Sequence, residues 1–314
     1  MADRPLRGTM IGCGFFAANH LQAWAEIEDV DLVAVCDREE SKAAVWAERL
    51  SIDAVFADAE RMLAETKPDF VDICTTVETH RPLVELAARH EIPAICQKPF
   101  AETWEDGVAM VEACRLAGVP LLIHENFRWQ RPFIELQQQL KTGVIGTPHF
   151  ARLTFRHGVF EDLYANQPYL KTAKHFAIMD VGIHLYDLAR FLMGEVKDVA
   201  CRTQRLHPEV VGEDAVVSTL GHESGAISVV DISFYAKQEP EIFPETLVWI
   251  QGEEGALELD RHYKLFVRKP GALEELDVDA AVPAWGERPW HVVQDSVINI
   301  QRHWVECLRR GMEP

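Results

Sequence analysis

The sequence predicts an α/β protein of two domains, a doubly wound parallel sheet followed by a domain with a large, mostly antiparallel open sheet. Its length of 314 residues favours two domains over one. Residues 1–125 alternate short β-rich runs with amphipathic stretches, which is typical of parallel strands covered by helices on both faces. Beyond residue 146, strand-like runs follow one another with few helical stretches between them. We therefore expect domains at 1–125 and 126–314.

In the first domain, hydrophobic periodicity assigns strands and helices in strict alternation. The expected strands are Thr9–Gly12, Leu32–Cys36, Phe70–Thr75, Ala94–Gln97 and Leu121–Glu125. The expected helices are Phe16–Ile27, Glu39–Leu50, Ala59–Thr66, His80–His90 and Trp104–Ala117.

In the second domain, the turn-rich segment Gly143–Pro148 is followed by one expected helix and several strand-like runs. Because no long helices separate the later runs, we expect these to pair antiparallel in one sheet. The expected strands are Phe150–His157, Val196–Arg205, Ala215–Leu220, Ala226–Phe234, Thr246–Ile250, Ala256–Leu259 and Leu265–Arg268. A helix is expected from about Ser296 to Arg310.

Composition restricts the partners and the compartment. The 31 basic and 50 acidic side chains give a formal charge of −19, which repels nucleic acid. No apolar run is long enough to span a bilayer, and the first residues lack a signal-peptide core, so we expect a cytoplasmic protein with no membrane partner. The seven cysteines are odd in number and include no C-x-x-C pair, which favours reduced, packed thiols and no zinc site.

A glycine-rich turn carries the first functional signal. Gly12–Ala17 fits G-x-G-x-x-A between an expected strand and an expected helix, the fingerprint of a Rossmann dinucleotide-binding domain. Gly12 permits the tight turn, Gly14 lets the backbone approach a pyrophosphate, and Ala17 allows close packing of helix on strand. The N–H groups at the start of the helix can bind the phosphates.

Asp37, at the end of the next strand, selects between the two nicotinamide cofactors. Its carboxylate can accept hydrogen bonds from a ribose hydroxyl and would repel a 2′-phosphate, which favours NAD. The next residue, Arg38, could instead bind that phosphate, so NADP stays open at this point.

Two further motifs, at matching positions in the two expected domains, resemble the Gfo/Idh/MocA family of oxidoreductases, which act on sugars and polyols. Gln97-Lys98-Pro99 corresponds to the family's Glu-Lys-Pro, and Asp180–Asp187 fits its D-x-G-x-H-x-x-D. The resemblance covers nearly the whole chain. It implies that Lys98, Asp180 and His184 form the catalytic group in an interdomain cleft, that the Lys98–Pro99 peptide is cis, and that the protein is a homodimer or homotetramer.

The expected binding residues follow from the fingerprint and from this resemblance. For the cofactor they are Gly12, Gly14, Phe15, Phe16, Ala17, Asp37, Arg38, Thr75, His80, Gln97 and Lys98. For a sugar-like substrate they are Asn126, Arg128, Lys174, Asp180 and His184. Lys174 lies in a local basic cluster that would either bind a substrate carboxylate or simply face solvent.

These residue types suit the oxidation of an alcohol, in which a base removes the hydroxyl proton while the cofactor accepts the hydride. Histidine is a suitable base at neutral pH, and Asp180, four residues before His184, would share its face of an α-helix. Lys98 could stabilise the developing alkoxide. Gln97 departs from the family because it removes a negative charge beside Lys98, so proton transfer at the lysine is expected to differ from that in relatives.

Two other functions remain open from the sequence. One is a nicotinamide-binding sensor without turnover, although a sensor would not need both Lys98 and His184. The other is a metal-dependent hydrolase or isomerase that uses Asp180, His184 and Asp187, which would share one helical face. We expect no metal, because no additional His or Cys pair nearby completes a coordination shell.

Overall fold

The computed structural model describes residues 4–158, 164–165, 167–236 and 245–314. They form two compact units: Met1–Glu125 with Val297–Pro314, and Asn126–Ser296. The division after Glu125 coincides with the expected boundary. The last residues, expected in the second domain, instead pack in the first unit, because Trp304 is fully buried in an apolar cluster with Trp24 and Phe70.

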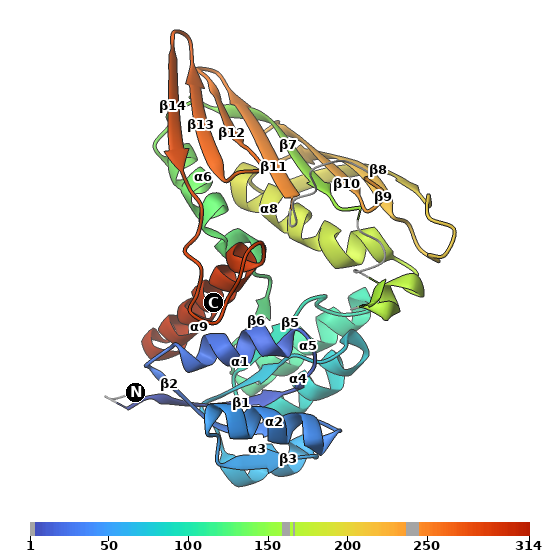
Figure 1. Cartoon of the computed structure of the whole chain (residues 1–314), viewed down its shortest axis with the longest axis vertical. Coiled ribbons are helices and arrows are strands. Elements are labelled where there is room, and N and C mark those ends of the chain that lie inside the picture. The colour runs from blue at the N-terminus through green and yellow to red at the C-terminus, as the bar shows by residue number, and fades with distance from the viewer. Residues whose placement is uncertain (1–3, 159–163, 166, 237–244) are drawn as a thin grey trace. The chain divides into compact units, whose positions relative to one another are not determined.

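The first unit contains a six-stranded parallel sheet in the order β3-β2-β1-β4-β5-β6, as expected for a Rossmann fold (Figure 1). Its strands are β1 (Leu6–Ile11), β2 (Val30–Cys36), β3 (Ala54–Phe56), β4 (Phe70–Ile73), β5 (Ala94–Gln97) and β6 (Leu121–His124). Its helices are α1 (Ala17–Ala25), α2 (Glu40–Leu50), α3 (Ala59–Thr66), the 3-10 turn η1 (Val77–Thr79), α4 (His80–Arg89) and α5 (Trp104–Ala117).

Helices cover both faces of this sheet, as the alternating burial of the strands requires. On β1, Met10 joins an apolar cluster with α1 and α2, whereas Ile11 joins another cluster with α3, α4 and α5. Because successive strand residues point to opposite faces, β1 and β2 each contribute to both clusters. The short strand β3 was not expected from the sequence, and the other five strands lie where we expected them.

The second unit contains an eight-stranded sheet in the order β14-β13-β12-β11-β7-β10-β9-β8 (Figure 1). Its strands are β7 (Pro148–Arg156), β8 (Val196–Gln204), β9 (Ala215–His222), β10 (Ile227–Ser233), β11 (Glu245–Gly252), β12 (Ala256–Leu259), β13 (Lys264–Lys269) and β14 (Ala272–Asp277). Its helical segments are η2 (Phe127–Trp129), α6 (Arg131–Lys141), η3 (Pro168–Lys171), η4 (Ile178–Gly182) and α8 (Ile183–Met193). The long helix α9 (His291–Arg310) begins in this unit and continues into the first.

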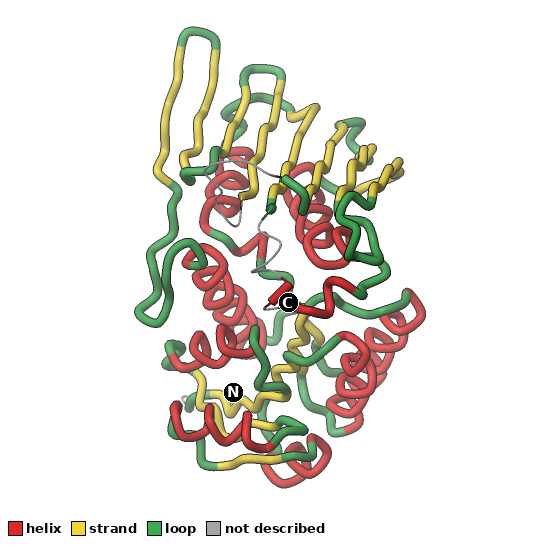
Figure 2. Tube along the Cα trace, turned by 45° about the vertical axis from the view of Figure 1, so that its right-hand side comes forward, coloured by secondary structure: helices red, strands yellow, loops and turns green. Residues whose placement is uncertain are grey.

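One face of the larger sheet is packed and the other is open. Along β9, Val216, Ser218 and Leu220 are buried while Val217 and Thr219 are exposed. Helix α8 packs against β7 and β10, and helical segments lie along one side of the strands in Figure 2. The strands pair antiparallel except β7 with β10, which are parallel. Strand β14 and helix α6 were not among the expected elements.

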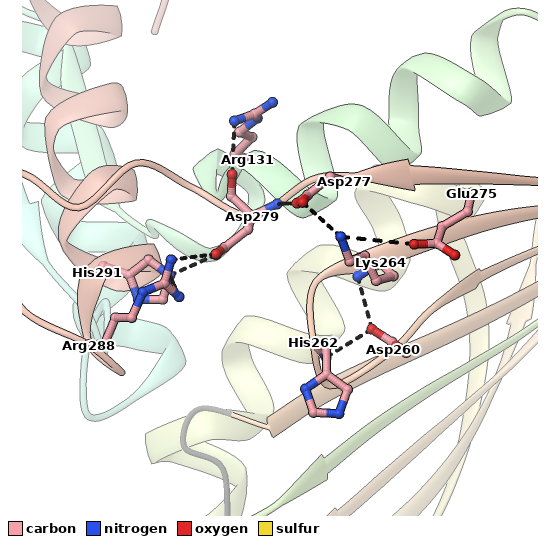
Figure 3. A network of polar contacts seen from close by, with 9 residues as sticks. All are labelled: Arg131, Asp260, His262, Lys264, Glu275, Asp277, Asp279, Arg288 and His291. Atoms are coloured by element: carbon pink, nitrogen blue, oxygen red, sulfur yellow. Dashed lines mark hydrogen bonds and ion pairs between the residues drawn. The ribbon is translucent and has the colours of Figure 1, made fainter.

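A polar network joins the segment that follows β14 to two helix starts (Figure 3). The backbone carbonyl of Asp279 accepts a hydrogen bond from Arg131 at 2.8 Å. Its carboxylate lies 2.6 Å from Arg288 and 2.7 Å from Nε2 of His291. Lys264 pairs with Asp277 at 2.7 Å. These contacts fix the chain between the sheet edge and α9. No helix among the described residues is both long and apolar enough to cross a membrane.

Candidate active site

The glycine turn after β1 is shaped by close contact with the neighbouring strand end. Gly12 has a φ of +98°, and a Cβ at this position would lie 2.2 Å from the carbonyl oxygen of Cys74. Gly14 differs, because a Cβ there would meet no atom within 4 Å. Ala17, the first residue of α1, is buried against the sheet. The turn therefore needs glycine at Gly12 for the fold and leaves open space at Gly14, into which a phosphate group fits.

Asp37 holds the end of β2 against the same turn. Its Oδ2 accepts a hydrogen bond from the N–H of Cys13 at 2.8 Å, and its Oδ1 accepts one from the N–H of Glu39 at 2.9 Å. Each oxygen keeps a lone pair for a ribose hydroxyl. Arg38 is exposed beside it, as is Phe15 at the tip of the turn. The residues present fit a dinucleotide.

Lys98 and Pro99 are joined by a cis peptide, as the resemblance implied. Gln97 ends β5 and is buried, and its Oε1 accepts a hydrogen bond from the N–H of Lys98 at 2.6 Å. The side chain of Gln97 therefore faces the interior of the unit and contacts Lys98 through the backbone.

His80, the first residue of α4, is buried and lies between two backbone carbonyls. Its Nδ1 lies 3.0 Å from the carbonyl oxygen of Pro99, and its Nε2 lies 3.2 Å from that of Thr75. Burial lowers the pKa of His80. Thr75 also accepts a hydrogen bond from the hydroxyl of Thr79 at 2.8 Å. His80 thus connects the segments that follow β4 and β5.

In the second unit, Asp180 lies in a π-helical turn, Ile178–Gly182, that leads directly into α8. Asp180 and His184 were expected on one face of an α-helix, and Asp180 instead lies in a π turn, which is wider than an α-helical turn. Such single turns are frequent at functional sites. Gly182 allows it here, because a Cβ would lie 3.2 Å from the carbonyl oxygen of Ala177 and 3.5 Å from Ile232 on β10.

Glu213 anchors the start of this turn. Its side-chain Oε1 accepts a hydrogen bond from the N–H of Ile178 at 3.0 Å, and its carbonyl oxygen accepts one from the N–H of Ala177 at 2.9 Å. Glu213 was not among the expected residues, since a lone glutamate in a loop gives no signal that it caps a turn distant along the chain. Residues before β9 therefore position the turn that carries Asp180.

His184 is buried, and its ring stacks on Phe127 with a centroid distance of 4.0 Å and an angle of 7°. Phe127 comes from η2, so this segment and α8 together fix the imidazole plane. Asp180, four residues earlier, is partly buried. A carboxylate and an oriented imidazole therefore lie within one short helical segment.

Arg128 forms a two-point ion pair with Asp187. Its Nε donates to Oδ2 at 2.7 Å, its second nitrogen contacts Oδ1, and its guanidinium lies 5.0 Å from the ring centre of Phe191. Asp187 is therefore bound to an arginine, which argues against its use as a metal ligand. The described residues contain no group of three or more His, Cys, Asp or Glu side chains arranged to hold a metal ion.

The other two residues expected to bind substrate have contrasting environments. Asn126 is buried, and its amide donates to the hydroxyl of Ser296 at 2.7 Å. Lys174 is exposed on the segment before the π turn, and the neighbouring Lys171 pairs with Glu209 at 2.8 Å. The structure thus brings Arg128 and His184 together through η2 and α8, and gives Asn126 a hydrogen bond inside the unit.

Comparison with known proteins matches both units. The model of an oxidoreductase family with an NAD-binding Rossmann fold matches residues 6–125, and that of the GFO/IDH/MocA C-terminal domain matches residues 133–258. The chain is 43% identical over 308 residues to a D-apiose dehydrogenase of Rhizobium rhizogenes, covering 98% of this chain and 89% of the relative. A D-apiose dehydrogenase of Paraburkholderia graminis is 45% identical over 308 residues, covering 98% and 82%.

A solved structure shows the same similarity in three dimensions. The crystal structure of an oxidoreductase from Agrobacterium radiobacter, in complex with NAD+, L-tartaric acid and magnesium, matches with a TM-score of 0.95 at 43% identity. The match covers 98% of this chain and 90% of that one.

Proposed function

Because the chain belongs to the Gfo/Idh/MocA family of NAD-binding oxidoreductases, we propose that it is a D-apiose dehydrogenase. It is an NAD-dependent dehydrogenase that transfers a hydride between the nicotinamide and a hydroxyl carbon of a sugar, polyol or sugar acid. The observation that carries the choice of sugar is its 43% and 45% identity, over 98% of its length, with two relatives of that name.

We propose that the oxidised atom is a hydroxyl carbon of the sugar, which becomes a carbonyl carbon. His184 removes the hydroxyl proton, and its stacking on Phe127 keeps the ring plane fixed while it does so. Asp180 orients the imidazole or binds an adjacent hydroxyl. Lys98 donates a hydrogen bond to the reacting oxygen and stabilises the negative charge that develops on it. Bound NAD supplies the hydride acceptor.

For the cofactor, we propose that the glycine turn receives the pyrophosphate and Asp37 the adenosine ribose. Open space at Gly14 and the remaining lone pairs of Asp37 support this arrangement. A carboxylate at this position repels a 2′-phosphate, so we infer a preference for NAD over NADP. Arg38 and Phe15, which are exposed at the turn, complete the adenosine side.

For the substrate, we propose that Arg128 acts chiefly by supporting α8, since Asp187 already occupies its guanidinium. Asn126 supports the segment before Phe127 from within the unit. Lys174, which is exposed, is the remaining candidate for direct contact with the sugar. The substitution Lys174→Met would then raise KM for the sugar and leave KM for NAD unchanged.

The test is the NAD-dependent appearance of NADH absorbance with D-apiose, compared with a panel of unbranched pentoses, hexoses and inositols. His184→Asn keeps the size and removes the base, so turnover should fall by about 100-fold or more while NAD binding persists. Phe127→Leu, which removes the stacking ring alone, should lower kcat more than it changes KM. Faster turnover of an inositol or a hexose than of D-apiose would refute the proposed substrate.

We also propose that the open face of the larger sheet forms a subunit interface in a homodimer or homotetramer. Val217 and Ile227 are exposed on this face, although both are apolar. Light scattering after size exclusion tests this, and Val217→Lys should shift the mass toward the monomer. Seven free cysteines support a cytoplasmic, reducing location for the enzyme.

A further inference from the structure

A buried chain of hydrogen bonds runs from β4 to the peptide of Lys98. Asp72 is fully buried, and its Oδ2 lies 2.8 Å from Nδ1 of His20, which is also fully buried. Nε2 of His20 lies 3.0 Å from the side-chain nitrogen of Gln97. Oε1 of Gln97 accepts the N–H of Lys98 at 2.6 Å. All four residues belong to the first unit.

The direction of each hydrogen bond in this chain follows from its last member. The backbone N–H of Lys98 can only donate, so the oxygen of Gln97 must face it. The amide nitrogen of Gln97 therefore faces His20 and donates to Nε2, which must carry a lone pair. The ring proton of His20 is then on Nδ1 and is donated to Asp72. The geometry requires a neutral imidazole of one defined tautomer.

We propose that Asp72 and His20 are positioning residues for Lys98, and that residue 97 is an amide because its partner is a neutral histidine. A glutamate at position 97 would accept from Lys98 with one oxygen and present the other to the lone pair of His20. That arrangement is repulsive unless His20 takes up a second proton and lies between two carboxylates. The presence of Gln97 in place of the glutamate of Glu-Lys-Pro and the presence of His20 on α1 thus have one common explanation. The inference rests on the proposed role of Lys98.

Few other titratable groups among the described residues lie near the His20 ring and could affect its protonation. His124 on β6 stacks on it with a ring-centre distance of 3.9 Å, and Asp72 is the facing carboxylate. Cys74 and Cys96 lie near Asp72 and Gln97, and burial raises the pKa of both thiols, so they stay protonated. From α9, the neutral amide of Gln301 donates to the backbone carbonyl of His20 at 3.3 Å.

The first measurement reads the tautomer of His20 without any assay of activity. Nitrogen-15 NMR of the histidine-labelled protein, with His20 assigned by its loss in His20→Gln, should show a neutral ring protonated at Nδ1. In Gln97→Glu the same ring should be doubly protonated at neutral pH. A wild-type His20 protonated at Nε2 would overturn the inference, whether or not the variant folds.

The second measurement is the pH profile of kcat/KM for D-apiose, expressed as the ratio of variant to wild type. For Gln97→Glu the ratio should be near one at about pH 6 and fall roughly tenfold or more toward about pH 9, as His20 loses its second proton. In His20→Gln/Gln97→Glu the amide at position 20 cannot titrate, so the ratio should be independent of pH.

The matched control is Gln138→Glu, which adds the same charge at an exposed site on α6 and should give a flat ratio near one. A flat ratio near one for Gln97→Glu as well would refute the positioning role. Absence of wild-type activity on D-apiose would instead refute the proposed substrate, and the NMR result would stand independently of it.

Discussion

The two glycines of the dinucleotide turn differ in the space available for a side chain. Substituting each by alanine should therefore separate an effect on folding from an effect on cofactor binding. At Gly12 the new Cβ would lie 2.2 Å from a backbone oxygen, that of Cys74, and φ is +98°. At Gly14 the Cβ would meet no atom within 4 Å, and φ lies outside the left-handed region. Gly12→Ala should therefore destabilise the unit, whereas Gly14→Ala should not.

The size of the effect at Gly12 follows from its two sources. A non-glycine residue in a disfavoured backbone region costs about 1–3 kcal/mol. Inserting a methyl group against immobile backbone costs about 1–3 kcal/mol more. The two costs sum to about 2–6 kcal/mol. For a unit of this size each kcal/mol lowers Tm by about 2–4 °C, so Gly12→Ala should lower Tm by about 4–24 °C.

Gly14→Ala should change Tm by less than about 2 °C and weaken NAD binding by about tenfold or more, because its methyl group fills the space proposed for the pyrophosphate. Thermal unfolding followed by circular dichroism gives Tm, and calorimetric titration with NAD gives Kd. An unchanged Tm for Gly12→Ala would refute the steric argument. An unchanged Kd for Gly14→Ala would refute the placement of the phosphates.

Three further predictions test packing, electrostatics and cofactor choice. Trp304→Ala should destabilise the first unit by about 3–5 kcal/mol in urea unfolding. Trp304→Phe should cost less than about 1.5 kcal/mol. The indole N–H that it removes has no hydrogen-bond partner in the described structure. The hydrogen bonds from Arg4 hold the pKa of Asp69 below its usual value, so Asp69→Asn should lower stability at neutral pH. The stability difference between wild type and variant should shrink as pH falls through and below about 3.9. A stability difference that does not change with pH would contradict this prediction. Asp37→Asn should raise the ratio of kcat/KM with NADP to that with NAD by about tenfold, measured with saturating sugar.

Much of the fold could be predicted because its signals are local. Residues 59–66 and 104–117 alternate apolar and charged positions at helical spacing, and both helices have the expected bounds. The short strand β3 and the edge strand β14 were missed for a physical reason. Strand β3 is only three residues long, and no residue of β14 is buried, so neither shows a sustained apolar pattern on which the assignment depends.

The sequence predicted only those site features that belong to a short local motif. The glycine turn and the cis Lys98–Pro99 peptide are of this kind. The cap that Glu213 provides for the π turn was not predictable, because it depends on contact between segments distant along the chain. The π turn itself has no sequence signature, so the sequence predicted α-helical spacing between Asp180 and His184 instead.

The change at residue 97 shows why a motif read alone can mislead. Replacing a carboxylate by an amide looks like the loss of a charge beside Lys98. In the structure, the side chain of Gln97 faces inward and meets His20, so the change matters through the protonation state of a residue 77 positions away. A buried donor facing a buried acceptor is favourable, and two facing acceptors are not. Residues 20, 72 and 97 should therefore change together among relatives, with a protonated or differently oriented partner wherever residue 97 is a glutamate.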